Sequence, residues 1–219
     1  MRVSIIVPVL NEAAVLQPLL QMLSSRGTEV IVVDGGSSDG SLDIARQFAD
    51  RCLQSSPGRA RQMNAGAACA EGEWLWFVHA DTRLLNPLDE YLSFIKRTDC
   101  WGFFGLELSS PGFSFRLIER FINWRSRVSS IATGDQGIFL RRKLFNELGG
   151  FAEQPLMEDV ELSKRLRRAA PAAASKILLQ TSSRRWEKRG VVRTVLLMWR
   201  LRLLYFLGAS PQWLARQYR

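Results

Sequence analysis

A histidine and an aspartate follow a short apolar segment that suits a buried strand. Residues 74–78 read Trp-Leu-Trp-Phe-Val, and His79 and Asp81 come directly after them. A carboxylate can hold a divalent cation against a phosphate-bearing ligand, and an imidazole can ligate a metal or move a proton. His79 is the only histidine among the 219 residues. The alternative is a histidine that holds a loop through a backbone hydrogen bond, and the residue types alone leave both interpretations open.

A second candidate pair, the acidic residues Glu158 and Asp159, begins a segment in which Val160, Leu162 and Leu166 indicate a helix. A carboxylate beside an acceptor hydroxyl can take its proton as the oxygen attacks. Acidic residues are also common in the first turn of a helix, where they oppose the macrodipole. The pair is therefore a candidate for base catalysis or an ordinary helix start.

The elements that must position these residues alternate between strand and helix along the first 80 residues. Strands are expected at 3–9, 29–33, 51–54 and 74–78, and helices after 11–12, at 41–49 and at 60–70. Continuous apolar strands separated by helices indicate a parallel sheet covered on both faces. Ligands bind beyond the carboxyl ends of such strands. We therefore expect loops 8–12, 34–40, 58–61 and 79–81 to meet at one edge.

The motifs at these strand ends narrow the class of protein. No G-x-G-x-x-G follows the first strand and no GxxxxGK[ST] occurs, which argues against dinucleotide-binding and P-loop folds. The motifs present are Val-Pro-Val-Leu-Asn-Glu at 7–12, Val-Asp-Gly-Gly-Ser-Ser-Asp-Gly-Ser at 33–41, His-Ala-Asp at 79–81 and Met-Glu-Asp at 157–159. In this order they resemble the family 2 glycosyltransferases, whose domain has the GT-A fold. The stretches 58–67, 134–142, 157–168 and 182–190 resemble a bacterial subgroup of small enzymes called selenodomain-associated transferases.

The resemblance implies an α/β protein with the GT-A fold, in which a mostly parallel central sheet has helices on both faces. Residues 1–170 would form the catalytic domain. Residues 171–219 would form a basic, apolar helical extension packed on the domain or on a membrane surface. The implied activity is that of an inverting glycosyltransferase, which moves a sugar from a nucleotide sugar, expected to be UDP-linked, to an acceptor hydroxyl.

The resemblance also implies a set of nucleotide-binding residues: Pro8, Glu12, Asp34, Gly36, Arg59, Arg61 and Asn64. A carboxylate after a buried strand can accept hydrogen bonds from a base or ribose, and an arginine fork suits phosphate oxygens. The alternatives are an Asx-turn at Asp34, a helix-start charge at Glu12 and surface charges at the two arginines.

In the same resemblance, Asp159 would be the catalytic base, with Glu158 beside it, and Asp81 would hold Mg²⁺ or Mn²⁺ on the diphosphate. His79 takes the place of the first Asp of the family's DxD motif. In the separate nucleotide loop at 33–41, Gly35 stands where an Asp is more usual. The acceptor and diphosphate side would contain Asp135, Gln136, Arg184, Arg185 and Trp186. Ser182 stands where processive members carry Gln, which argues against processivity.

Charge is distributed unevenly along the chain. Residues 163–219 hold 14 Lys and Arg but one acid, Glu187, within a net charge of +9. Such a segment favours an anionic partner. Residues 113–128 and 191–207 interleave apolar residues with arginines, as interfacial helices do, although arginine stems also cover ordinary packed helices. We expect a lipid-linked acceptor and peripheral contact with the cytoplasmic face of the membrane.

Other features bound the function further. Three widely spaced cysteines favour a reducing cytosol, and neither a targeting segment nor a run of about 20 apolar residues is seen. No RNA-binding motif supports a nucleic-acid partner. Two rival functions remain: a sugar-phosphate nucleotidyltransferase, and a non-catalytic nucleotide-binding or scaffold protein of the same fold.

Overall fold

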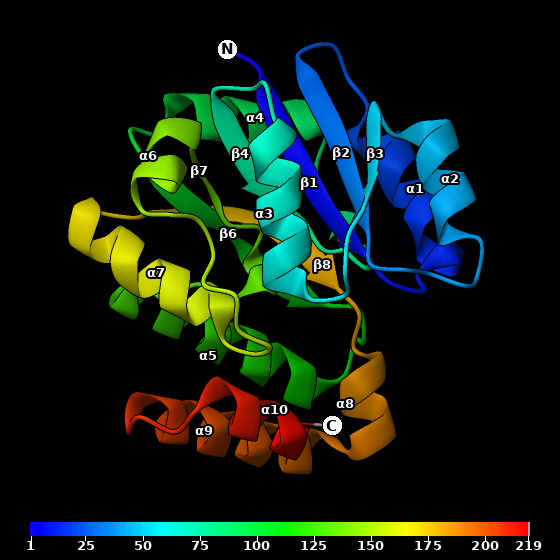
Figure 1. Ribbon diagram of the computed structural model, residues 1–219. Helices are drawn as coiled ribbons and strands as arrows, with labels where there is room; N and C mark the ends of the chain where they lie inside the picture. Colours follow the sequence, from blue (N-terminus) through cyan, green and yellow to red (C-terminus); the bar gives the residue numbers. More distant parts are fainter. Residues whose placement is uncertain (219) are drawn as a thin grey trace.

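A single eight-stranded sheet organises the protein (Figure 1). The computed structural model describes residues 1–218, apart from the side chains of Arg185, Lys188 and Arg189. The strands are β1 (Val3–Val9), β2 (Thr28–Asp34), β3 (Arg51–Gln54), β4 (Trp74–Phe77), β5 (Arg83–Leu84), β6 (Trp101–Leu108), β7 (Phe139–Arg141) and β8 (Ala173–Thr181). Their order is β3-β2-β1-β4-β7-β6-β8-β5. The first four strands run parallel, and β7 enters antiparallel to both β4 and β6.

Helices cover both faces of this sheet, as the sequence predicted. The helices are α1 (Ala13–Leu23), α2 (Ser41–Phe48), α3 (Arg59–Cys69), α4 (Leu88–Arg97), α5 (Phe113–Ser129), α6 (Arg142–Glu147), α7 (Glu158–Ala169), α8 (Arg184–Arg189), α9 (Val191–Phe206) and α10 (Pro211–Tyr218), with the 3-10 turn η1 (Gly134–Gln136). One apolar core packs α1, α2 and α4 on the sheet, and a second packs α3, α6 and α7 on the other face. The strands are buried on both sides, which explains their continuous apolar runs.

Helix α3 lies unusually close to the sheet because small residues face the strands. A Cβ atom added at Gly66 would lie 2.6 Å from Cγ2 of Ile6 and 3.1 Å from Cγ2 of Val33. The close approach brings the first turn of α3, which begins at Arg59, beside the carboxyl ends of β1 and β2. Packing at an apolar contact thus positions the charged end of the helix.

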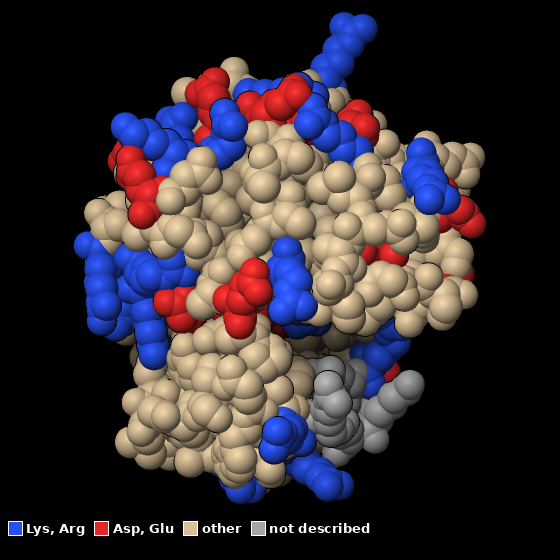
Figure 2. Space-filling view, in the orientation of Figure 1, with Lys and Arg blue, Asp and Glu red and all other residues tan. Residues whose placement is uncertain are grey.

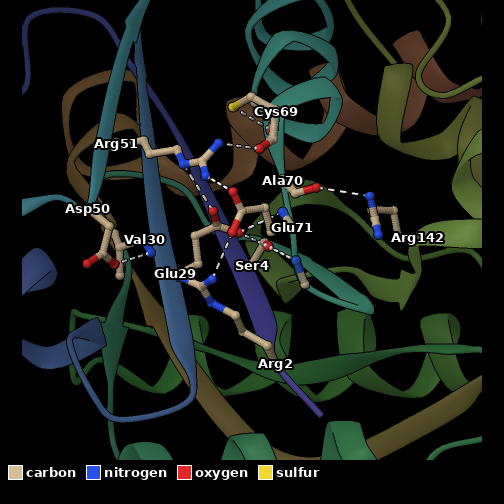
Figure 3. A network of polar contacts seen from close by, with 12 residues as sticks. Arg2, Ser4, Glu29, Val30, Asp50, Arg51, Cys69, Ala70, Glu71 and Arg142 are labelled. Atoms are coloured by element: carbon tan, nitrogen blue, oxygen red, sulfur yellow. Dashed lines mark hydrogen bonds and ion pairs between the residues drawn. The ribbon is translucent and has the colours of Figure 1, made fainter.

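The amino edge of the sheet is tied together by a polar network (Figure 3). Glu29, at the start of β2, is fully buried, and it accepts hydrogen bonds from the Ser4 hydroxyl and, at 2.8 Å, from the backbone N–H of Glu71. Arg51 Nε lies 3.2 Å from Oε1 of Glu29. Burial alone would raise the pKa of Glu29, but these hydrogen bonds and the charges of Arg2 and Arg51 lower it overall. The network therefore holds a buried carboxylate in its charged form.

The C-terminal quarter divides between the sheet and a separate helical layer. Strand β8 pairs with β6 and β5, so the boundary expected at residue 170 falls just before a strand of the main sheet. Helices α9 and α10 form a layer beneath α5 (Figure 1). Leu201 and Leu214 pack there against Ile131, Met157 and Val160. Within residues 1–218, no helix has the length and apolar character needed to cross a membrane.

Candidate active site

Two loops at the carboxyl edge are joined by hydrogen bonds into one surface. The Asn11 N–H donates to the Ser37 hydroxyl at 2.9 Å, and the Ser38 N–H donates to Oδ1 of Asn11 at 2.8 Å. The Ala13 N–H donates to Oδ2 of Asp39 at 3.0 Å, so Asp39 supports the start of α1. Asn11 adopts a φ of 55°, a left-handed conformation that Asn tolerates better than most residues. The expected nucleotide loop is thus rigidly attached to the end of β1.

Asp34 ends β2 and is fully buried beneath this loop. Its Oδ2 accepts hydrogen bonds from the N–H groups of Gly36, at 2.9 Å, and Ser37, at 3.0 Å. This is the Asx-turn that the sequence left as an alternative. Its Oδ1 is buried without a hydrogen-bond partner in the described part of the chain. One oxygen therefore shapes the loop, and the other is buried with its hydrogen-bonding capacity unused.

Gln62, which the sequence analysis did not identify, holds the same edge together. Its amide nitrogen donates to the carbonyl oxygens of Val9 and Val33, each at 2.8 Å. The amide also occupies the space in which a side chain at Gly35 would begin, since a Cβ there would lie 3.1 Å from that nitrogen. Gln62 lies four residues before Gly66 on the face of α3 that packs on the sheet. A polar residue on the buried face of α3 is the sequence signal that could have identified Gln62.

Four charged residues from distant parts of the sequence meet beside the loop. Arg184 Nη2 lies 3.6 Å from Oε2 of Glu12. Burial and the negative charge of Asp81 raise the pKa of Glu12, although the charges of Arg184 and Arg59 oppose this. Four residues predicted to contact the nucleotide, the metal or the diphosphate therefore lie close enough to interact.

The carboxylates of Glu12 and Asp81 suit a cation. In the described ranges, no group of three or more His, Cys, Asp and Glu side chains is arranged to hold a metal. Mg²⁺ in nucleotide sites, however, is commonly held by one or two carboxylates together with phosphate oxygens and water. The charge of Asp81 disfavours ionisation of the neighbouring Glu12, and a cation between them would relieve this repulsion. Asp81 and Glu12 therefore fit a metal that arrives with a nucleotide.

His79 connects the end of β4 to the turn η1. Its Nδ1 lies 3.0 Å from Oδ1 of Asp135. The ring packs so tightly on Gly134 that a Cβ atom there would lie 2.5 Å from it. His79 thus holds a loop, as in the alternative that the sequence left open, but through the side chain of Asp135 and not through a backbone hydrogen bond. Ligation of a metal by His79 stays a prediction.

The acidic pair of α7 faces the same turn. Asp159 Oδ2 accepts a hydrogen bond from the Gly134 N–H at 2.8 Å. Glu158 is buried, and burial followed by the charge of Asp159 raises its pKa, against the opposing charges of Arg59 and His79. A small cavity is lined by His79, Gly134, Glu158 and Asp159 together. The strand-end histidine and the acidic pair thus belong to one site.

Three other predicted site residues have their polar groups engaged by the protein. Asn64 donates to the carbonyl of Phe151 and accepts from its N–H, both at 2.9 Å. Arg61 Nε lies 3.4 Å from a carboxylate oxygen of Glu153 at the surface. Gln136 is fully buried and fastens η1 by accepting hydrogen bonds from the Ser126 hydroxyl at 2.7 Å and the Thr133 N–H at 3.1 Å. In this conformation, Asn64 and Gln136 position loops around the site.

The remaining predicted residues lie at its borders. Pro8 is buried in β1, paired in register with Val33. Gly36 has a φ of 93°, which the loop requires. Trp186 lines an apolar groove beside Asp135, and the side chain of Arg185 lies outside the described residues.

With this geometry established, comparison with known proteins assigns the family. The model of the family described as "Glycosyl transferase family 2" matches residues 4–149, which include β1 to β7 and η1. The chain belongs to glycosyl transferase family 2.

Curated relatives of this family 2 chain match over shorter segments. A "PGL/p-HBAD biosynthesis glycosyltransferase" of Mycobacterium tuberculosis is 41% identical over 91 residues, which are 37% of this chain and 36% of the relative. "Glycosyltransferase AglE" of Haloferax volcanii is 48% identical over 52 residues, 22% of this chain and 17% of the relative. The chain thus spans little more than a third of the length of the mycobacterial relative.

Solved structures establish the GT-A fold. A Pyrobaculum calidifontis mannosyltransferase in complex with GDP-Man and Mn²⁺ is 20% identical with a TM-score of 0.67, over 99% of this chain and 68% of that one. S. aureus TarS 1-349 in complex with UDP is 21% identical with a TM-score of 0.62, over 83% of this chain and 60% of that one. At such identities the likeness concerns the fold, and it confirms the fold expected from the sequence.

Proposed function

We propose that the protein is an inverting glycosyltransferase that moves a sugar from a UDP-linked donor to an acceptor hydroxyl. The supporting observation is the position of Arg59. Its positive charge acts on Glu12, at the nucleotide side, and on Glu158, in the acidic pair. The two groups of acidic residues that the sequence separates by about 150 positions therefore lie in one site.

The nucleotide would bind over the joined loops of β1 and β2. The free Oδ1 of Asp34 is oriented by its own turn and can accept a hydrogen bond from an N–H group of the base. Arg59 and Arg61, in the first turn of α3, would contact phosphate oxygens. Mg²⁺ or Mn²⁺ held by Asp81 and Glu12 would supply positive charge to the leaving diphosphate. UDP and Mn²⁺ accompany a related fold in "glucosyl-3-phosphoglycerate synthase" of Mycobacterium tuberculosis, 19% identical with a TM-score of 0.58 over 81% of this chain and 70% of that one.

The acceptor would approach between η1 and α7. Asp159 takes the proton of the acceptor hydroxyl as its oxygen attacks the sugar C1. The attack comes from the face opposite the nucleoside diphosphate, so the anomeric configuration inverts. Arg184, beside Glu12, would stabilise the departing diphosphate, while Asp135 keeps the His79 ring in place. Glu158 adds negative charge beside Asp159 and so favours the proton transfer.

The proposed setting is the cytoplasmic face of a bacterial membrane, with peripheral attachment. Large apolar side chains are exposed on α5 and α9, among them Leu117, Trp124, Val192 and Trp199. Arg193 and Arg200 are exposed on the same α9 helix. This combination suits an interfacial helix. Membership of the selenodomain-associated subgroup is part of the same proposal.

The rival functions differ in their support. A non-catalytic nucleotide-binding protein is favoured by His79 and Gly35, which stand where the family more usually has Asp. A nucleotidyltransferase is not favoured, because Leu10-Asn11-Glu12 follows β1 in place of a basic, glycine-rich loop.

Calorimetric titration of UDP, GDP and a panel of their sugars, with and without Mn²⁺, tests the proposal. We expect Mn²⁺-dependent binding of UDP that weakens at least tenfold in Asp81→Ala and is unchanged in Asp89→Ala, an exposed aspartate on α4. Folded protein that binds no nucleotide would contradict the proposal. Binding without sugar transfer to any acceptor or to water would favour the non-catalytic alternative.

A further inference from the structure

Residues of α5 and α9 line an apolar groove beside the candidate active site. Its volume is about 580 Å³, within the range of small-molecule sites. Ile118, Phe121, Val195 and Trp199 are among the side chains that line it. The rings of Phe121 and Trp199 lie 5.4 Å apart between centroids, so the two helices meet across the groove.

The inner end of the groove lies at the turn η1. Thr133 and Asp135 line it, and the residue between them, Gly134, donates its N–H to Asp159 at 2.8 Å. Asp135 in turn contacts His79. A ligand that fills the groove would therefore place its inner end within reach of the proposed base.

Two arginines line the same groove from opposite helices, Arg125 on α5 and Arg202 on α9. The Nε atom of each is buried, and neither has a hydrogen-bond partner in the part of the chain that the structure describes. Burial and the charge of Arg202 lower the pKa of Arg125 to about 10, and burial lowers that of Arg202 although the charges of Asp159 and Asp135 oppose this. Each guanidinium group therefore has an unused Nε–H donor at the groove.

The outer surface of the groove is apolar and basic. Leu117, Val192, Leu196 and Trp199 are each more than half exposed. Figure 2 shows that the surface over α9 and α10, at the bottom of the view, carries Lys or Arg at its margin and no Asp or Glu. Such a surface suits contact with an anionic lipid layer, from which an amphiphile could enter.

We propose that this groove binds an amphiphilic acceptor, with its hydrocarbon chain between α5 and α9 and an oxyanion head group, phosphate or carboxylate, held by Arg125 and Arg202. The proposal deepens the proposed function and rests on it, because a hydroxyl carried by the same head group as the oxyanion would then lie beside Asp159. Charge complementarity decides the occupant. A purely apolar chain would leave both Nε donors unsatisfied, whereas an oxyanion can accept from both.

Binding of single-chain probes in the absence of any donor tests this inference. The probes are dodecyl phosphate, dodecanoate, dodecanol and inorganic phosphate, with binding followed by calorimetry. The two anionic amphiphiles are kept below their micelle concentrations and dodecanol below its solubility limit. We expect the better of the two anionic amphiphiles to bind at least tenfold more tightly than dodecanol. A preference for dodecyl phosphate identifies a phosphate head group, and a preference for dodecanoate identifies a carboxylate.

Matched variants distinguish specific binding of the head group from nonspecific apolar binding. Arg202→Gln and Arg125→Gln should each remove the tenfold preference, while Arg200→Gln, an exposed arginine two residues away on α9, should keep it. Val195→Trp, which fills the groove, should weaken binding of every amphiphile, whereas Leu203→Trp at the surface should not. If an arginine variant does not fold, the comparison of dodecanol with the anions on the unmodified protein decides.

Equal affinity for dodecanol and both anions, or no binding of any amphiphile, would overturn the inference. Titration of UDP on the same sample distinguishes the two proposals. Retained UDP binding with no amphiphile binding removes only the groove assignment, and loss of UDP binding removes the donor site itself.

Discussion

The two edges of the sheet each hold a buried glutamate, yet their environments are opposite. Glu29 at the amino edge is 0% exposed and Glu158 at the carboxyl edge is 7% exposed. Hydrogen bonds and arginine charges lower the pKa of Glu29 in spite of its burial (Figure 3). Burial and the neighbouring Asp159 raise the pKa of Glu158. Burial alone therefore does not distinguish a structural carboxylate from a functional one, and the partners do.

The difference shows where the protein accepts unfavourable electrostatics. At the amino edge, the fold supplies Glu29 with a hydroxyl, a backbone N–H and two arginine charges. At the carboxyl edge, burial and a neighbouring carboxylate raise the pKa of Glu12 and that of Glu158, and a bound metal and substrate would complete their environment. Carboxyl groups with pKa values raised in this way are typical of active sites.

The largest effect should come from Asp159→Asn. Because the amide cannot take a proton from the acceptor, the rate of sugar transfer should fall by about 10³-fold, with UDP affinity unchanged. Transfer from the donor identified by calorimetry measures this, and Asp89→Asn on α4 is the control. Residual activity within tenfold of the unmodified protein would remove Asp159 as the base.

Glu29→Gln should act on stability and leave the site intact. The amide loses the charge that Arg2 and Arg51 surround, so the free energy of unfolding should fall by about 2 kcal/mol at pH 7. Since the folded-state pKa of Glu29 is lowered, this contribution is present above the unfolded pKa and is lost as the pH falls through the folded value. Urea unfolding at pH 7 and pH 3 measures it. An equal loss at both pH values would contradict the assignment.

Glu158→Gln should have the smallest effect on stability, and of opposite sign. Because the folded-state pKa of Glu158 is raised, its ionisation opposes folding above that pKa, and the amide removes this cost. We expect the melting temperature at pH 7, in the presence of a chelator, to rise by about 3 °C, with no gain below the unfolded pKa. A lower melting temperature of Glu158→Gln at pH 7 would contradict this prediction. It would show that the site stabilises the charged form of Glu158, as the amino edge stabilises the charged form of Glu29.

The sequence allowed prediction of the elements that are locally encoded. The apolar runs of β1, β2 and β4 and the helical spacing of α1 and α7 agree with the structure because each is buried as a continuous strand or along one helix face. The meeting of the strand-end loops followed from the parallel connection of these elements. The family assignment is confirmed over residues 4–149, which include the motifs at 7–12, 33–41 and 79–81 but not the acidic pair at 158–159.

Contacts between distant segments could not be predicted in this way. Nothing in the sequence near Gly35 indicates that Gln62 fills its space, and nothing near Glu12 indicates Arg184. The residues 113–128 and 191–207 were identified as basic and apolar, but their pairing across a groove depends on how α9 returns beneath α5. Helical spacing alone puts Arg202 on the face opposite Arg193 and Arg200 but does not say which face is covered; in the structure Arg202 lines the groove while the other two are exposed.

The lack of a side chain at Gly66 determines how close Arg59 lies to the donor site. Arg59 lies seven residues before it, about 10 Å along the axis of a rigid helix. A methyl group at position 66 would overlap Ile6, so the helix would have to move away from the sheet and carry Arg59 with it. A displacement of about 1 Å is enough to impair catalysis. Gly66→Ala ordinarily strengthens a helix. Here it would also move Arg59 away from the donor site, because the lack of a Cβ atom at position 66 is what allows α3 to lie so close to the sheet.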